Sequence, residues 1–133
     1  MSAASANPQY TSKTALQTVK QLTAGTCFSM ATATTLTNAS AVEIDCSLGN
    51  YFTLATTSAV GAVTLTAVNH TIGQPIWVIF SATGGAQTVT FSTGINYVSS
   101  TLSVTQDKSF VVAYISSASR LWEASRTTAI TVA

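Results

Sequence analysis

The chain has 133 residues, of which 47% are hydrophobic and only 7% are charged, and its formal net charge is +1. This length suits one domain. Ordinary soluble domains carry roughly 25% charged residues, so much of this surface must consist of Thr, Ser, Ala and apolar atoms. Such a surface is weakly protected against association, and we expect partner subunits to cover part of it. A monomer kept soluble by its hydroxyl groups is the alternative.

The basic residues are scattered along the chain, which argues against nucleic acid or an anionic membrane surface as a partner. No apolar run approaches the roughly 20 residues that span a bilayer. The N-terminal sequence MSAASANPQYTSK lacks the basic start and apolar centre of a secretory signal. These features predict a protein made and used without export through the secretory pathway.

Residues 1–25 are predicted to form an N-terminal arm, rich in Ala, Ser and Thr. Leu16, Val19 and Leu22 recur at every third position, which is a weak helical pattern. The threonines and the β-branched Val19 favour an extended segment equally. An unstructured terminus is the third alternative.

Residues 26–133 alternate short apolar runs with turn residues, which predicts an all-β domain: an antiparallel β-sandwich, jelly-roll-like, with the arm extending from it. No long helical pattern follows the arm, so parallel βαβ units are not expected. The expected strands are Thr26–Met30, Thr34–Thr37, Ala41–Asp45, Asn50–Thr56, Ala62–Ala67, Ile76–Thr83, Gln87–Ser92, Thr101–Thr105, Ser109–Ser116 and Arg120–Ser125. The expected inward-facing residues are Phe52, Leu54, Val63, Leu65, Ile76, Val78, Phe80, Val89, Phe91, Leu102, Val104, Phe110, Val112 and Tyr114.

The stretch Pro75–Ser92 is the most distinctive and reads as a β-hairpin. Its first run is apolar on both faces, it breaks at Gly84-Gly85, and its second run alternates apolar and hydroxyl residues. A two-layer sandwich buries only one face of a sheet. The second apolar face, with Trp77 and Ile79, therefore needs the arm, the C-terminal tail or another subunit over it. The tail TTAITVA is β-prone and is expected to close the sheet or to add to a neighbour's edge.

Residues that carry chemistry are few, and no catalytic residue, cofactor or metal site is predicted. Glu43 and Asp45 share one strand face, which is most simply a solvated edge. His70 is the single histidine and lies in a turn-like stretch without a nucleophile motif. Cys27 and Cys46 either pair or stay reduced and buried, and the absence of a secretory signal favours the reduced state.

Threonine pairs occur at Thr35–Thr37, Thr64–Thr66 and Thr88–Thr90, so a water-ordering threonine ladder was considered. Their unequal gaps argue against stacked coils with a constant period. We expect these threonines on the wet faces of half-buried strands.

Several aromatic residues are available either for a sugar-stacking platform or for the core: Trp77, Trp122, Tyr51, Tyr97 and Tyr114. Arg120 and Arg126 flank Trp122 and are placed to stack on it or to fix a subunit contact.

The stretch from Leu48 to Thr128 resembles a β-sandwich module of virion proteins in tailed bacteriophages. The resemblance is carried by LGNYFTL, AVTLTAVNHTIGQPIWVIF, GGAQTVTF, TLSV and SFVVAYISSASRLWEASRT. It covers about 80 residues, is diffuse, and contains no catalytic motif. It implies a structural role without enzymatic activity.

The short chain with one arm and one sandwich is most similar to capsid decoration (cement) proteins. The resemblance implies a location on the virion capsid surface, the major capsid protein as partner, and a homotrimer on threefold axes, made in the host cytoplasm. A tail, fibre or baseplate module that binds a host receptor or glycan is the alternative, in which Trp77 and Tyr97 would be exposed. The predicted capsid or subunit contacts are Tyr10, Lys13, Leu16, Val19, Lys20, Leu22, Trp77, Arg120 and Arg126.

Overall fold

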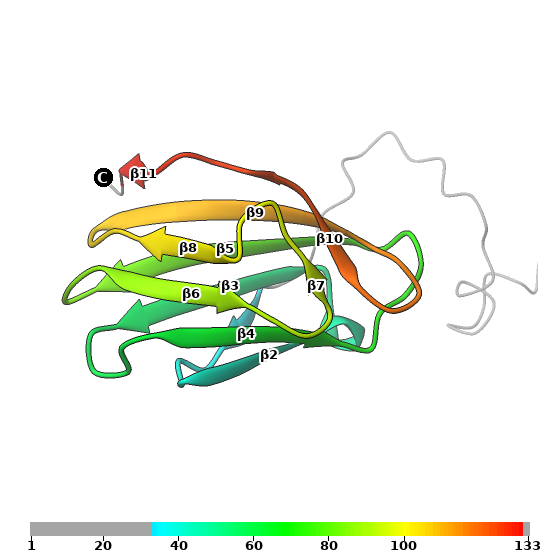
Figure 1. The fold of residues 1–133 in the computed structure, drawn as a ribbon, viewed down its shortest axis with the longest axis horizontal. Coiled ribbons are helices and arrows are strands. Elements are labelled where there is room, and N and C mark those ends of the chain that lie inside the picture. Colours follow the sequence, from blue (N-terminus) through cyan, green and yellow to red (C-terminus); the bar gives the residue numbers. More distant parts are fainter. Residues whose placement is uncertain (1–32, 132–133) are drawn as a thin grey trace, which may run out of the picture.

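A computed structural model describes residues 33–131, and this part of the chain is built almost entirely from β-strands (Figure 1). The elements are β1 (Thr34–Leu36), β2 (Ala41–Asp45), a 3-10 turn (Cys46–Leu48), β3 (Tyr51–Thr57), β4 (Val63–Val68), β5 (Pro75–Thr83), β6 (Gln87–Phe91), β7 (Ile95–Asn96), β8 (Thr101–Val104), β9 (Lys108–Ser116), β10 (Leu121–Arg126) and β11 (Ile130–Thr131). The prediction of an all-β domain is confirmed for these residues. The expected strand Thr26–Met30 and the arm over residues 1–25 lie outside them.

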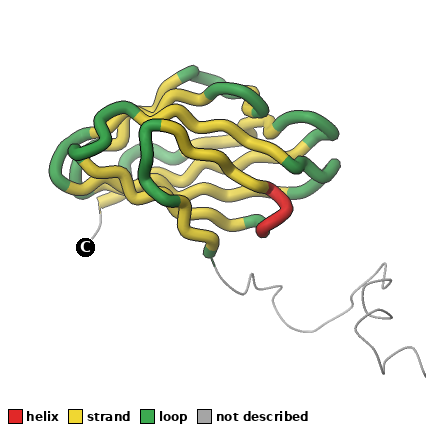
Figure 2. Tube along the Cα trace, turned by 90° about the horizontal axis from the view of Figure 1, so that it is seen from below, coloured by secondary structure: helices red, strands yellow, loops and turns green. Residues whose placement is uncertain are grey.

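The strands form two sheets that lie face to face (Figure 1). Sheet A has the order β1-β3-β5-β9-β10-β7, with β11 beside β9, and sheet B has the order β2-β4-β6-β8. Figure 2 shows the strands running along the molecule, with most turns gathered at its two ends. The C-terminal tail adds to sheet A within the same chain, because the short strand β11 pairs antiparallel with the start of β9.

Strands β1 to β6 alternate between the two sheets, and within each sheet they pair in parallel. The chain therefore winds around the core rather than folding back on itself. Antiparallel pairing begins only where β9 joins β5 and β10, and where β8 joins β6. The predicted antiparallel, jelly-roll-like pairing is wrong for the first six strands.

The predicted hairpin over Pro75–Ser92 is also wrong. Strand β5 pairs with β3 and β9 in sheet A, whereas β6 pairs with β4 and β8 in sheet B. Gly84 (φ +74°) and Gly85 (φ +142°) allow the chain to step from one sheet to the other. The inward side chains of the two strands then meet across the core, where the rings of Phe80 and Phe91 lie edge to face at 6.2 Å.

The core between the sheets contains every residue predicted to face inward. Alternation within each strand is set by the pleat, so the inward set could be predicted without knowing the strand partners. The prediction did not include several further buried apolar residues: Val42, Ile44, Cys46, Ala67, Ala82, Ile95 and Leu121.

The outer face of sheet B carries two of the three threonine pairs, Thr64–Thr66 on β4 and Thr88–Thr90 on β6. Thr64 pairs with Thr90, and Thr90 pairs with Thr101 on β8. The third pair begins at Thr35 on β1, which belongs to sheet A, so the unequal gaps reflect threonines on different sheets. The threonines lie on the solvent side of half-buried strands, as predicted.

Candidate functional site

The outer face of sheet A carries a strip of large apolar side chains, which we call the apolar strip: Tyr51, Trp77, Ile79, Ile115 and Trp122. It arises because the first three outward positions of β5, Pro75, Trp77 and Ile79, are apolar like its inward positions. Cross-strand pairing brings Tyr51 beside Trp77, and Ile115 beside Trp122. Trp77 is 37% exposed, Ile115 45% and Trp122 52%. The outward positions of β3, β5 and β9 carry no charged residue.

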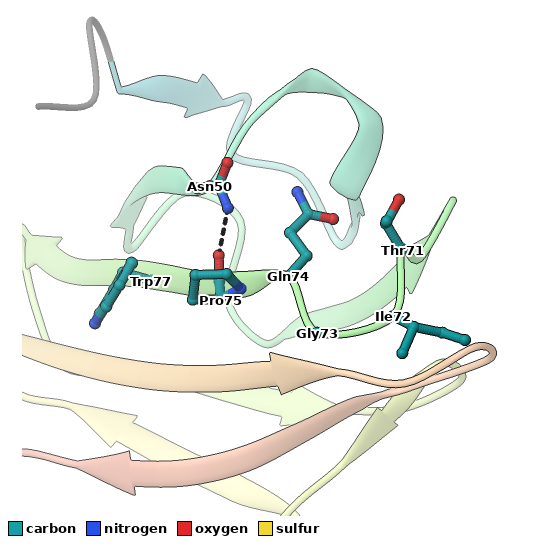
Figure 3. A pocket seen from close by; sticks show the side chains of 7 residues that line it. All are labelled: Asn50, Thr71, Ile72, Gly73, Gln74, Pro75 and Trp77. Atoms are coloured by element: carbon teal, nitrogen blue, oxygen red, sulfur yellow. Dashed lines mark hydrogen bonds between the residues drawn. The ribbon is translucent and has the colours of Figure 1, made fainter. Parts of the chain in front are cut away.

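One end of the apolar strip opens into a hollow of about 620 Å³ beside Trp77 and Pro75 (Figure 3). Asn50 closes one side, and its Nδ2 donates a 2.7 Å hydrogen bond to the Pro75 carbonyl. Gln74 supports the neighbouring turn, because its Nε2 donates to the carbonyls of Cys46 and Gly49 at 2.8 and 3.0 Å. This hollow is lined mainly by apolar atoms, so it suits an apolar contact.

A second hollow, of about 660 Å³, lies where β7 joins β10. Its walls combine two exposed aromatic residues, Tyr97 and Trp122, with polar residues that include Asn96 and Arg120. The Arg120 Nη1 donates to the Asn96 Oδ1 at 3.2 Å. The Tyr97 ring stacks on Phe91, with the ring centroids 6.3 Å apart.

A buried ion pair supports the loop that carries Tyr97. The Arg126 Nη2 and Nε donate to the Glu123 carboxylate at 2.7 and 2.5 Å, and only 1% of the Glu123 side chain is exposed. The second carboxylate oxygen also accepts a hydrogen bond from Val98 N at 3.0 Å. Arg126 further donates to the carbonyls of Ser99 and Thr101. The pair thus ties the β7–β8 loop to β10.

Each member of this ion pair stabilises the charged form of the other. Burial acts to raise the pKa of Glu123, but hydrogen bonds from Arg126 and from Val98 N, with the Arg126 charge, lower it below its ordinary value. The hydrogen bond to Glu123 raises the pKa of Arg126 in turn. Burial, followed by the charge of Glu123, also raises the pKa of the enclosed Tyr114 hydroxyl. The ionised pair is therefore the stable form at neutral pH.

The spacing of Glu123 and Arg126 along the sequence does not reveal that they form an ion pair. Residues three apart on a regular strand point to opposite faces. The register of β10 against β9 shifts between Glu123 and Ser125, and this bulge turns Arg126 to the inner side with Glu123. The Glu-x-x-Arg spacing at the end of the expected strand Arg120–Ser125 was the available signal, but the pairing of Glu123 with Arg126 follows only from the bulge.

The predicted contact residues fall into three groups. Trp77 lies in the apolar strip and Arg120 lines the second hollow, both exposed. Arg126 is occupied by Glu123 and backbone carbonyls inside the molecule. The remaining six lie outside the described residues: Tyr10, Lys13, Leu16, Val19, Lys20 and Leu22.

The aromatic residues do not form one platform. Tyr51 and Trp77 are neighbours in the apolar strip, and Tyr97 lines the second hollow, while Trp122 belongs to the strip and also lines that hollow. Tyr114 is 2% exposed and belongs to the core. Some of these aromatic residues therefore belong to the core, and others lie at the surface, where they are available to a ligand or a partner.

Four of the residues that could carry chemistry lie in the described part of the chain: Glu43, Asp45, His70 and Cys46. Glu43 is exposed on the edge strand β2, as predicted, while Asp45 accepts hydrogen bonds from Ser47 and Asn69, which lower its pKa. The His70 Nε2 lies 3.3 Å from the Gly94 carbonyl oxygen. Cys46 has a free, buried thiol, whose pKa burial and the nearby Asp45 charge raise to about 11. Cys27 lies outside the described part of the chain.

Within residues 33–131, no cluster of His, Cys, Asp and Glu has the arrangement needed to hold a metal ion. No helix in the same range has the length and apolarity needed to cross a membrane. Comparison of the chain with protein-family models, curated proteins and solved structures finds no match.

Proposed function

We propose that this chain is a structural virion protein, a capsid decoration (cement) protein that binds the outside of a phage head and stabilises the shell. The observation that carries the proposal is the exposed apolar strip on sheet A, whose surroundings on β3, β5 and β9 are free of charge. Such a surface can be buried against protein without desolvating ions. The resemblance of Leu48–Thr128 to phage virion modules supports the same role.

In this proposal the apolar strip packs against further copies of the chain, and the arm over residues 1–25 contacts the major capsid protein. In a closed homotrimer the apolar strip of every copy is buried against a neighbouring copy. Such a trimer also fits a threefold position on the shell. The arm gains order when it binds and spreads over neighbouring capsid subunits. We interpret β1–β6 as coils of a short, flattened β-solenoid, which gives the bound module a stiff body.

Virions that lack the protein test the proposal directly. Their shells are expected to assemble but to lose resistance to heat or to low ionic strength, measured by DNA release. Unchanged particle stability would refute the cement role. Deletion of residues 1–25 is expected to abolish shell binding while the sandwich still folds. Retained binding would move the capsid contact to the sheets.

A tail, fibre or baseplate module that binds a host receptor or glycan is the second candidate. The observation that favours it is the exposure of Trp77 (37%) and Tyr97 (46%), each beside a hollow. Immunogold labelling of virions distinguishes the two candidates, because it places the protein on the head or on the tail. A second test is adsorption of the purified protein to host cells, which only the receptor-binding candidate requires.

A further inference from the structure

The hollow between β7 and β10 has the composition of a saccharide site. Tyr97 and Trp122 offer exposed ring faces, against which the apolar face of a sugar ring can stack. Hydroxyl and amide groups of Ser92, Thr93 and Asn96 line the same space and can pair with sugar hydroxyls. Its volume of about 660 Å³ lies within the range of about 300–1,000 Å³ that is usual for small-molecule sites.

Arg120 adds a charge preference to this hollow. Its guanidinium donates to the Asn96 Oδ1, and no carboxylate among the described residues lies within salt-bridge distance of it. The acid that follows it most closely on β10, Glu123, is already neutralised by Arg126. Several Arg120 N–H groups therefore remain for a ligand, and their planar arrangement fits a carboxylate through two parallel hydrogen bonds.

The walls of the hollow are held in place before any ligand arrives. Gly94 adopts φ +80° and packs so closely on Ala67 that a Cβ would lie 2.0 Å from the Ala67 carbonyl oxygen. The Gly94 carbonyl accepts from Leu121 N at 2.8 Å, which fixes β7 against β10. The Glu123–Arg126 pair holds Val98, next to Tyr97. Such preorganisation lowers the entropic cost of binding.

From this arrangement we infer that the hollow binds a carboxylated sugar unit of a surface polysaccharide. One ring stacks on Tyr97 or Trp122, its hydroxyls pair with Asn96, Ser92 and Thr93, and its carboxylate accepts from Arg120. The inference deepens the receptor-binding candidate and rests on it; the shell-binding proposal instead places Trp122 in a subunit contact, as part of the apolar strip.

The test is calorimetric titration of the full chain with oligosaccharides of galacturonate, mannuronate and sialic acid, each beside its neutral methyl ester. At least one acid is expected to bind, and its ester to bind about ten- to hundredfold more weakly, because the charge-assisted hydrogen bonds are lost. Arg120→Gln is expected to remove the preference for the acid. Trp122→Ala is expected to weaken acid and ester alike, and thermal melting verifies that each variant is folded.

Lys108→Gln is the matched control for charge, because Lys108 lies at the far end of β9 and contacts Thr131. It is expected to bind as the unaltered chain does. Failure of every saccharide to bind, equal binding of acid and ester, or an unchanged preference in Arg120→Gln would each overturn the inference. If the chain adsorbs to host cells while no saccharide binds, receptor binding stands and this ligand class is wrong.

Discussion

At the scale of single residues, the Glu123–Arg126 pair combines several tasks. It neutralises a side chain that is only 1% exposed and fixes two backbone groups of the β7–β8 loop and one at the start of β8. Arg126 also lies over the Phe91 ring, with its Cζ 5.4 Å from the ring centroid. The loop that carries Tyr97 therefore depends on one carboxylate.

Glu123→Ala is expected to lower the free energy of unfolding by about 3 kcal/mol, because it leaves the Arg126 charge and Val98 N without their partner. The lower part of the usual range applies because the Arg126 side chain is 22% exposed. Urea denaturation measures the change. Glu43→Ala is the control, since Glu43 is exposed on an edge strand and should alter stability by less than about 0.5 kcal/mol. Equal losses in the two variants would contradict the proposed role of the ion pair.

The same carboxylate predicts a pH dependence of stability. The pKa of Glu123 is lower in the folded chain than in the unfolded chain. Its stabilising contribution is thus complete above the unfolded pKa of about 4.3 and is lost as the pH falls through the folded pKa. Urea denaturation at several pH values between about 7 and 3 is expected to show a smaller acid loss in Glu123→Gln. Asp45, whose pKa is also lowered, contributes equally to both proteins.

Gly94→Ala is expected to destabilise the fold by about 3 kcal/mol or more, because it combines a strained positive φ with a clash against the Ala67 carbonyl. Gly61→Ala is a matched control: Gly61 has a similar φ of +75°, but nothing lies within 4 Å of the added Cβ. It should cost about 1 kcal/mol, from backbone strain alone. Thermal unfolding compares the two variants, and similar costs would show that the contact with Ala67 is unimportant.

At the scale of elements, the three-residue loop Gly84-Gly85-Ala86 between β5 and β6 decides the topology. A loop of this kind can join hydrogen-bonded neighbours or connect strands in opposite sheets. The side-chain pattern of β5 and β6 is the same in both cases, since alternation reports the buried face and not the bonded partner. The parallel neighbours of β5 and β6 come from strands more than twenty residues earlier in the sequence, which no local signal identifies.

A pair of cysteine variants tests this topology. Thr53→Cys with Ile79→Cys is expected to cross-link, because the two residues are partners on β3 and β5, about 5 Å apart in a parallel pair. Ile79→Cys with Thr90→Cys should not cross-link, because these residues lie on the outer faces of different sheets. Both pairs are made with Cys27→Ser, and Cys46 stays unreactive because it is buried with a pKa near 11. Peptide mapping after mild oxidation identifies the cross-links. A cross-link in the second pair and none in the first would contradict this topology and support a hairpin over Pro75–Ser92.

At the scale of the whole molecule, the two outer faces differ in chemistry. Sheet B presents threonine and serine to solvent, whereas sheet A presents the apolar strip. A stable interface buries roughly 1,200–2,000 Å² with an apolar centre. The face of sheet A has that character, so association is expected to use this side of the molecule.

Trp77→Asp is expected to convert the assembly into monomers, because it places a charge within the apolar strip. Native mass spectrometry should give about three times the 13.7 kDa of one chain for the unaltered protein and a single chain for the variant. Thr64→Asp, on the outer face of sheet B, is the control and should leave the mass unchanged. A monomeric unaltered protein would refute self-association through this face.

The sequence alone determined most of the strands and most of the inward-facing residues, because these depend on local alternation of apolar and polar residues and on glycine or polar residues at the strand ends. Ile76, Val78, Phe80, Val89 and Phe91 could all be assigned to the core in this way. Only the tertiary structure decided which strands pair, that the chain winds between two sheets, and that Arg126 faces Glu123. Hydrogen-bonded strand partners and bulges depend on contacts between segments that are distant in the sequence. The alternation of side chains with a period of two residues does not identify them, because it is the same for any neighbouring strand.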